Sequence, residues 1–354
     1  MNQILLPRFL KKHTTTGKWS NKQIMYLVIL ALLPGVAVQA YFLGYGNIIQ
    51  ILWASLLALV YEGIFLKLRN RTIKPILDGS GLLTAWLLAI SIPGYAPWWI
   101  LVIGIFFAIV VSKQLYGGLG HNIFNPAMVG YVVLLISFPV HMTTWASPSH
   151  SSLIHQLQII DVIKVIFLEQ PINTFIAYDA ISQATTLDVF KQGLNTGKTF
   201  TDLLTEFSAT LTLVPVLDLK AAKGWLPINM AFMLGGFLLI ALKIIRWQIP
   251  FYFLLSLGTI SYISHLTYPE TVLSPTLHLL SGATMLGAFF ILTDPVSAST
   301  TPRGQIIYAL IVGFLVWLIR TFGGYPDAVA FAVLFANLCV PFIDHLTRTK
   351  PYGH

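Results

Sequence analysis

Long apolar runs separated by short polar stretches dominate this 354-residue chain. A helix needs about 20 mostly apolar residues to cross the hydrocarbon core of a bilayer. Ten segments have roughly that length and character, and they lie at 24–44, 48–67, 78–93, 97–113, 125–141, 225–245, 250–266, 272–293, 304–321 and 325–343. The pattern predicts an all-α integral membrane protein with about ten transmembrane helices, of which the third and fifth are short enough to be broken or re-entrant.

A long polar segment, 142–224, divides the chain into two halves of five apolar segments each. Ser80-Gly81 opens the third segment of the first half, and Ser281-Gly282 lies near the start of the third segment of the second half. An odd number of helices inverts the second half relative to the first, and inverted repeats place their sites near the midplane between them. We therefore expect two inverted five-helix repeats, 24–141 and 225–343, joined by a long loop.

The distribution of positive charge predicts the orientation. With ten helices both termini lie on one side of the membrane, and 15 of the 21 Lys and Arg residues fall on that side. Because cytoplasmic loops are enriched in Lys and Arg, we expect the N-terminal segment 1–23 and the tail 344–354 to be cytoplasmic. The loop 142–224 is then periplasmic, and the protein is a multi-pass protein of a bacterial inner membrane, with lipid as its surroundings.

Composition excludes several other classes of protein. Hydrophobic residues make up 56% of the chain and charged residues 10%, whereas soluble domains carry about a quarter charged residues. The net charge of +8 follows from membrane topology, so no nucleic-acid partner is expected. A single cysteine, Cys339, cannot form a disulfide, a zinc site or an iron–sulfur cluster within the chain. We expect no metal, and any redox centre must be organic, haem-like or carried by a partner.

The loop contains a hydroxyl-rich stretch at 178–188, with an acidic residue on each side of it. Its central residues are Asp179, Ser182, Ala184, Thr185 and Thr186. Taken alone, such a cluster is typical of a helix N-cap or a turn.

Two further places carry candidate chemistry. Asn122 and Asn125 precede the fifth apolar segment, where two carboxamides beside a helix start would suit a flat heterocycle with carbonyls and ring nitrogens. A glycine-rich turn with Asn125 as N-cap, and Pro126 in the first turn, explains them equally well. Asp294 ends an apolar run, and carboxylates at the membrane edge mark ion or proton paths. Capping of the following segment is the competing interpretation. Glu62 precedes a basic run at 67–74 and is expected to pair with it or to reach the interface.

Three motifs together resemble a known family. They are G-x-N-x-F-N-P-A at 120–127, S-G-x-T-M-L-G-A-F-F at 281–290 and T-D-P-V-S-A at 293–298. With the long loop, they resemble the RnfD component of the Rnf ion-translocating electron-transport complex over essentially the whole chain, and more distantly the corresponding membrane component of the sodium-pumping NADH:quinone reductase. The resemblance implies a membrane protein that relays electrons through flavins, coupled to Na⁺ or H⁺ translocation, together with the other Rnf complex subunits.

In that family a flavin transferase joins FMN by a phosphoester to a threonine in a motif close to D-x-x-S-G-A-T. Residues 179–185 keep the spacing with Gln183 in place of the glycine, whereas 281–284 carry the literal S-G-A-T inside an apolar run. A phosphate dianion is costly in hydrocarbon, and a transferase must reach its target. We therefore expect Thr185 as the acceptor, with its neighbour Thr186 as the alternative, and interpret 281–284 as small residues that let helices approach closely.

The resemblance also implies a second, non-covalent flavin, riboflavin, for which Asn122 and Asn125 are the matching positions. No dinucleotide fingerprint is visible, so no NADH site is expected in this chain. Two alternatives stay open. One is a protein like the quinone-reductase component, which should have a longer N-terminal region and the motif glycine. The other is a channel or secondary transporter built from inverted repeats, without any redox role.

Overall fold

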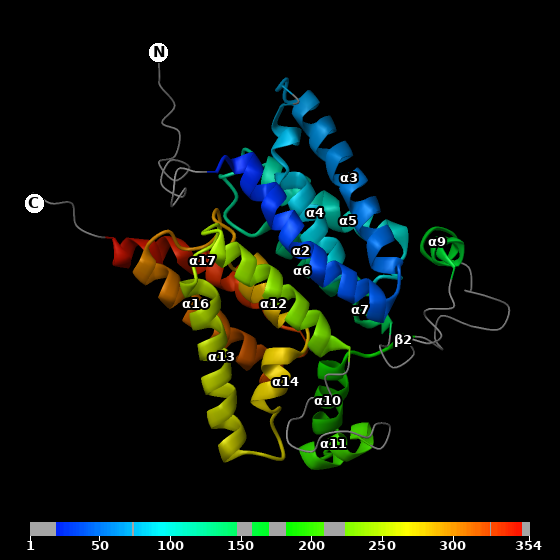
Figure 1. The fold of residues 1–354 in the computed structure, drawn as a ribbon, viewed down its shortest axis with the longest axis vertical. Coiled ribbons are helices and arrows are strands. Elements are labelled where there is room, and N and C mark those ends of the chain that lie inside the picture. The colour runs from blue at the N-terminus through cyan, green and yellow to red at the C-terminus, as the bar shows by residue number, and fades with distance from the viewer. Residues whose placement is uncertain are drawn as a thin grey trace, which may run out of the picture.

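The computed structural model describes residues 19–72, 74–146, 158–169, 182–208, 224–325 and 327–348. Within these ranges the chain is mostly helical (Figure 1). The sheet in the described part is one antiparallel pair, β1 (Trp145–Ala146) with β2 (Ser182–Gln183).

Helices of the first half gather in the upper part of Figure 1. They are α2 (Asn21–Leu43), α3 (Gly46–Leu68), the 3-10 turn η1 (Lys74–Asp78), α4 (Ser80–Ser91), α5 (Trp98–Ile105) with its π-helical continuation η2 (Phe106–Gln114), α6 (Pro126–Ser137) and α7 (Pro139–Thr143). The long loop contributes α9 (Ile159–Leu168), α10 (Thr186–Asn195) and α11 (Phe200–Ser208).

Helices of the second half lie below and to the left, ending in the red α17. They are α12 (Trp225–Ala241), α13 (Gln248–Thr267), α14 (Pro275–Leu280), α15 (Thr284–Leu286), the π-helix η6 (Gly287–Ile291), α16 (Pro302–Phe322) and α17 (Val329–Thr347). Among the described helices, α2, α3, α13, α16 and α17 are long and apolar enough to cross a membrane, and α4, α5–η2, α6 and α12 are shorter apolar helices.

The expected all-α membrane class is confirmed, with local differences from the sequence pattern. The third and fifth apolar segments are indeed short, as α4 and α6. The clearest interruption lies in the eighth segment, where the helix stops between α14 and α15 and Gly282 adopts φ +62°, a left-handed conformation that suits glycine. The fourth segment carries a π-helical stretch that apolar periodicity does not reveal.

The two halves meet where α12 packs along α2 and α17 packs along α6. Glycines allow α2 and α12 to approach closely. A Cβ at Gly235 would run into the backbone carbonyl of Ala31, and one at Gly35 would run into the ring of Phe232. Small residues of this kind let membrane helices pack backbone to backbone.

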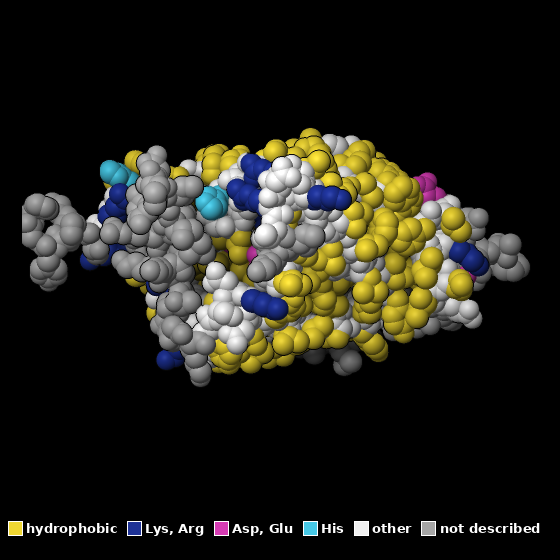
Figure 2. All heavy atoms as spheres, turned by 90° about the horizontal axis from the view of Figure 1, so that it is seen from above, with side chains coloured by type: hydrophobic (Ala, Val, Ile, Leu, Met, Phe, Trp, Pro, Cys, Tyr) yellow, Lys and Arg dark blue, Asp and Glu magenta, His cyan; other side chains and the backbone are white. Residues whose placement is uncertain are grey.

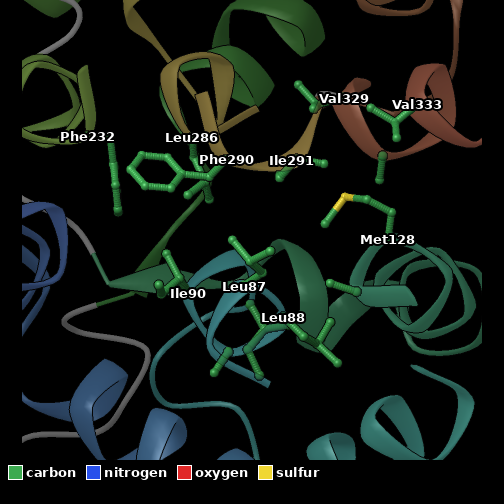
Figure 3. Packing of buried hydrophobic residues seen from close by; sticks show 14 of the residues in the cluster. Leu87, Leu88, Ile90, Met128, Phe232, Leu286, Phe290, Ile291, Val329 and Val333 are labelled. Carbon is green, nitrogen blue, oxygen red and sulfur yellow. The ribbon is translucent and has the colours of Figure 1, made fainter. Parts of the chain in front are cut away.

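Apolar side chains fill the space between the halves. The outer surface is also apolar over broad areas (Figure 2). Leu52 and Phe342, for example, are each 66% exposed. Exposed apolar surface on this scale marks contact with lipid or with other proteins. Figure 3 shows the inner packing, in which residues of α4 face η6 and its neighbours; the labelled residues are Leu87, Leu88, Ile90, Met128, Phe232, Leu286, Phe290, Ile291, Val329 and Val333.

Candidate functional site: two pockets between the halves

One pocket opens beside α10, and we name it the loop-side pocket. It encloses about 910 Å³ of space between atoms, its open mouth included. Its wall combines elements of both halves with the loop, and the aromatic members are Tyr131, Trp145, Trp225 and Phe232. Its polar side chains include Gln39, Thr185, Asp188 and Asp327. A mostly apolar wall with a few polar groups is typical of cofactor sites.

Thr185 lines this pocket and is the N-cap of α10. Its Oγ1 accepts a hydrogen bond from the backbone N–H of Asp188 at 3.3 Å. Its neighbour Thr186 is 7% exposed and is not part of the pocket wall. The free N–H groups at the start of a helix favour a phosphate, so an anion attached to Thr185 would lie in a favourable field.

Lys191 anchors α10 to the membrane helices. Its Nζ donates to the backbone oxygens of Ile319, at 3.1 Å, and Tyr325, at 2.9 Å, near the C-terminus of α16. Burial lowers the pKa of Lys191 to about 8, with Asp188 opposing the shift and Arg320 adding to it. Burial also raises the pKa of the Asp188 carboxyl, against a hydrogen bond from Gln192 and the charge of Lys191.

The two segments compared as candidate flavin-attachment motifs, 179–185 and 281–284, both contribute residues to this pocket. Gly282 and Ala283 line it together with Thr185, and a Cβ at Gly282 would lie 2.8 Å from Leu187 of α10. Thr284 is fully buried, and its hydroxyl donates to the backbone oxygens of His278 or Ser281. The close approach expected at 281–284 is therefore made by the loop helix α10.

The remaining loop residues predicted from the motif fall into two groups. Ser182 lies in β2 opposite Ala146, and Ala184 lies between β2 and α10, one residue before Thr185. Asp179 lies outside the described residues.

An ion pair lies at the wall of the loop-side pocket, with Arg320 fully buried and Asp327 25% exposed. Arg320 Nη2 lies 3.2 Å from Asp327 Oδ1. Arg320 also donates to the backbone oxygen of His278 at 2.7 Å, and Asp327 accepts from the Ala283 N–H at 3.1 Å. Asp327 is part of the pocket wall and Arg320 is not, so the carboxylate faces the space. The sequence alone did not single out this pair.

A second pocket lies at the end where α2 begins, and we name it the terminal-side pocket. It encloses about 800 Å³, open mouth included. Asn122, Asn125 and Asp294, which were predicted separately, all line it. Its other polar wall residues include Ser80, Thr84 and Lys113.

The two asparagines differ in how far their amides are already used. Asn125 is the N-cap of α6, accepting from Ala127 and Met128, and its Nδ2 donates to the backbone oxygen of Ile291 at 3.3 Å. The capping interpretation is therefore confirmed for Asn125. Asn122 makes one bond, from Nδ2 to the backbone oxygen of Phe124 at 3.0 Å. Its carbonyl oxygen is the better placed of the two amides to receive a ligand.

Asp294 also has local partners. Its carboxylate accepts from Ser297 Oγ at 2.7 Å and from the Val296 N–H at 3.4 Å, which closes the turn after η6. The carboxylate thus caps the following segment and lines the pocket at the same time.

Glu62 pairs with Lys113, not with the basic run at 67–74. Lys113 Nζ lies 2.8 Å from Glu62 Oε1 and 2.7 Å from Ser80 Oγ, and Gln114 donates to the same carboxylate oxygen at 2.7 Å. Both charged side chains are at most 3% exposed. A carboxylate inside an apolar helix requires such a partner, but sequence could not choose Lys113, which is 51 residues away.

Only a thin wall separates the two pockets. Ala127 lines the terminal-side pocket and Met128 the loop-side pocket, and the same division separates Phe290 from Ile291. On α4, Leu87 and Ile90 also face different pockets, and three residues span about 4.5 Å along a helix axis. The wall is the apolar layer of Figure 3.

Comparison with known proteins gives one consistent result. The sequence matches the family described as NQR2, RnfD, RnfE over residues 11–353. It is 50% identical, over 96% of each chain, to the protein of Shigella dysenteriae serotype 1 (strain Sd197) that is named as the D subunit of an ion-translocating oxidoreductase complex. Proteins of the same name from Escherichia coli O17:K52:H18 (strain UMN026 / ExPEC) and Escherichia coli (strain K12 / DH10B) match with the same identity and coverage.

Proposed function

The chain belongs to the NQR2, RnfD, RnfE family, and from that premise we propose that it is the RnfD-type membrane subunit of an ion-translocating oxidoreductase complex. Its task is to relay electrons through covalently bound FMN and riboflavin, coupled to Na⁺ or H⁺ translocation. The observation that carries this proposal is the pair of pockets, with Thr185 in the wall of one and a single apolar layer between them.

The loop-side pocket suits FMN in three respects. Thr185 offers a hydroxyl in the pocket wall, at the N-terminus of α10. Tyr131, Trp145 and Trp225 provide flat apolar surface for a ring system. A bound flavin supplies one- and two-electron transfer, which no side chain of this polypeptide provides.

Covalent attachment also explains how a phosphate-bearing cofactor could be retained in a pocket lined by carboxylates. The side chains that line the loop-side pocket include Asp188 and Asp327 and, among the described residues, no Lys or Arg. Such a wall offers no ion pair to retain a phosphate, so a covalent bond to Thr185 keeps the cofactor at high effective concentration.

The terminal-side pocket suits a neutral flavin without phosphate, since most of its wall is apolar and an uncompensated phosphate dianion is unfavourable beside apolar groups. Asn122 is the residue best placed to bind a ring carbonyl or nitrogen, and Asn125 shapes the same wall through its cap. Asp294 lines this pocket and is the candidate for ion coupling. The apolar layer lets electrons pass between closely spaced cofactors while hydrated ions are excluded.

The proposal includes the topology. We infer two inverted repeats, 24–141 and 225–343, with both termini cytoplasmic in a bacterial inner membrane and the loop 142–224 periplasmic. In support, the third apolar segments of both repeats line each pocket, with Ile90 and Gly282 in the loop-side pocket and Ser80 and Thr293 in the terminal-side pocket. Other subunits of the complex must deliver and accept the electrons, and a flavin transferase must modify Thr185.

Mass spectrometry of the denatured protein, produced together with its flavin transferase, tests the attachment. We expect a gain of one FMN less one water on the peptide that contains Thr185, absent in Thr185→Val and present in the matched control Thr186→Val. An adduct lost only in Thr186→Val would move the site by one residue. No adduct at all, with the transferase active on a control protein, would refute the covalent flavin.

One alternative has an observation in its favour. Two pockets at opposite ends, divided by a thin apolar layer, also describe a secondary transporter whose access alternates. Solute flux by the purified, flavin-free protein in liposomes would favour the transporter and exclude the redox role.

A further inference from the structure

Each pocket has an ion pair in or behind its wall, but the two pairs are oriented in opposite ways. The Glu62–Lys113 pair is buried, whereas Asp327 of the other pair is partly exposed. In the loop-side pocket the wall residue is Asp327, and its partner Arg320 lies behind. In the terminal-side pocket the wall residue is Lys113, and its partner Glu62 lies behind. A ligand in the first pocket therefore meets the negative end of a pair, and a ligand in the second meets the positive end.

Lys113 is held rigidly in this position. It is 2% exposed, and two of its three N–H groups are taken by Glu62 and Ser80. Ser80 in turn donates to Asp78 at 2.5 Å, so its oxygen lone pairs point to the ammonium group. The cluster thus orders the ammonium at the edge of the pocket and leaves one donor uncommitted among the described residues.

Glu62 is fixed on the far side of the ammonium group. Its Oε2 is buried without a hydrogen-bond partner among the described residues, and it packs against Gly81, where a Cβ would collide with it. Lys113 and Gln114 hold the other carboxylate oxygen, Oε1, and Glu62 is not part of the pocket wall. The dipole of the Glu62–Lys113 pair therefore has its positive end at the pocket wall.

Reduction of a flavin creates the charge that this arrangement favours. A neutral isoalloxazine that gains two electrons and one proton carries one negative charge, spread over N1 and the C2 carbonyl. The electrons come from the partner subunits through the loop-side flavin, and the proton comes from water. A buried cation near N1 stabilises the reduced form more than the oxidised form, because Coulomb interactions are strong where water is excluded.

We propose that Lys113 is a binding residue of the terminal-side pocket that raises the reduction potential of the flavin held there, with Glu62 and Ser80 as its positioning residues. This inference rests on the proposed function, since it requires a flavin in that pocket. None of the sequence motifs contains Lys113. In this proposal, Lys113 is the positively charged group that distinguishes the terminal-side pocket from the loop-side pocket.

Two substitutions with opposite expected effects on the reduction potential test the role of Lys113 in the assembled complex. Lys113→Met removes the positive charge, and the potential of the non-covalent flavin should fall. Glu62→Gln leaves the ammonium without its counter-charge, and the potential should rise. Each tenfold change in the preference for the reduced form shifts a two-electron potential by about 30 mV, and spectroelectrochemical titration resolves that shift. The FMN on Thr185 is the internal control and should not move.

Removing one partner of a buried pair leaves an uncompensated charge, which can destabilise the folded protein. A double variant is therefore the control for misfolding. Lys113→Met with Glu62→Gln removes both charges, and its flavin potential should lie below that of the wild type. Acid extraction and chromatography of the released flavin show whether the pocket is filled in each variant.

The outcomes distinguish the presence of a second flavin from the role of Lys113. Wild-type complex that releases no riboflavin would refute the second flavin of the proposed function, whatever Lys113 does. Riboflavin present at unchanged potential in both single variants, or shifted in the same direction in both, would refute the role of Lys113. Opposite shifts, with the FMN unmoved, would establish it.

Discussion

The loop-side and terminal-side pockets are both lined by residues of the two halves, yet they present different chemistry. The first has the hydroxyl of Thr185 and the carboxylates of Asp188 and Asp327 in its wall. The second has amides, the carboxylate of Asp294 and the ammonium of Lys113. One architecture can therefore serve a tethered, phosphate-bearing cofactor at one end and a neutral, untethered one at the other.

The largest expected effect comes from two matched glycine substitutions, each of which should destroy one pocket. Gly282→Val places a β-branched residue at φ +62° and against Leu187, which should displace α10 and abolish covalent FMN although Thr185 is intact. Gly81→Val collides with Glu62 and should empty the terminal-side pocket instead. Flavin analysis of both variants measures this, and loss of both flavins from either one would contradict independent sites.

Removing the anchor of α10 should have a smaller effect on the loop-side pocket alone. Lys191→Met removes the hydrogen bonds to the backbone oxygens of Ile319 and Tyr325. Ile319 keeps its bond from the Gly323 N–H, so the main cost is the lost partner of Tyr325, about 1–3 kcal/mol for a buried acceptor. Hydrogen exchange at 186–195 should become faster, while exchange in α6 stays unchanged. Equal acceleration in both elements would mean that the two pockets are mechanically coupled.

The same lysine predicts a pH dependence. Its pKa falls from 10.5 to about 8 in the folded protein because of burial. The undocked state therefore binds more protons than the docked state between pH 8 and 10.5, and docking of α10 should strengthen as pH rises through that window. The slope is at most about 1.4 kcal/mol per pH unit. Exchange rates at 186–195 measured from about pH 7.5 to 9.5, compared with the chemical rate, report it, and Lys191→Met should show no such trend.

The smallest effects are expected for Asn122 and Asn125, for which the sequence predicts the same role. Asn122→Ala removes one local hydrogen bond and one pocket-facing oxygen, and should weaken retention of the non-covalent flavin by tenfold or less, about 0.5–1.5 kcal/mol. Asn125→Ala removes a helix cap and should destabilise the start of α6 by about 1 kcal/mol. Thermal unfolding and flavin retention distinguish them, and identical profiles would refute the division of roles.

Much of the fold could be predicted because hydrophobic runs are local. A segment such as Pro302–Phe322 is long and apolar whatever surrounds it, so its helix follows from sequence alone. The caps are local too, since Thr185 and Asn125 bond to N–H groups within three residues. For the same reason, the motif residues Asn122 and Asp294 were identifiable without knowing that they line one pocket.

The sequence by itself determined the class of protein and most of the helical segments, and it led to the prediction of Thr185 as a flavin acceptor. Tertiary structure decided which charges meet, because Glu62 and Lys113 are 51 residues apart and no local pattern links them. It also decided that Thr185 faces the S-G-A-T segment across a pocket and that one apolar layer separates the two pockets. Both depend on how remote helices pack, and packing is a property of the whole folded chain.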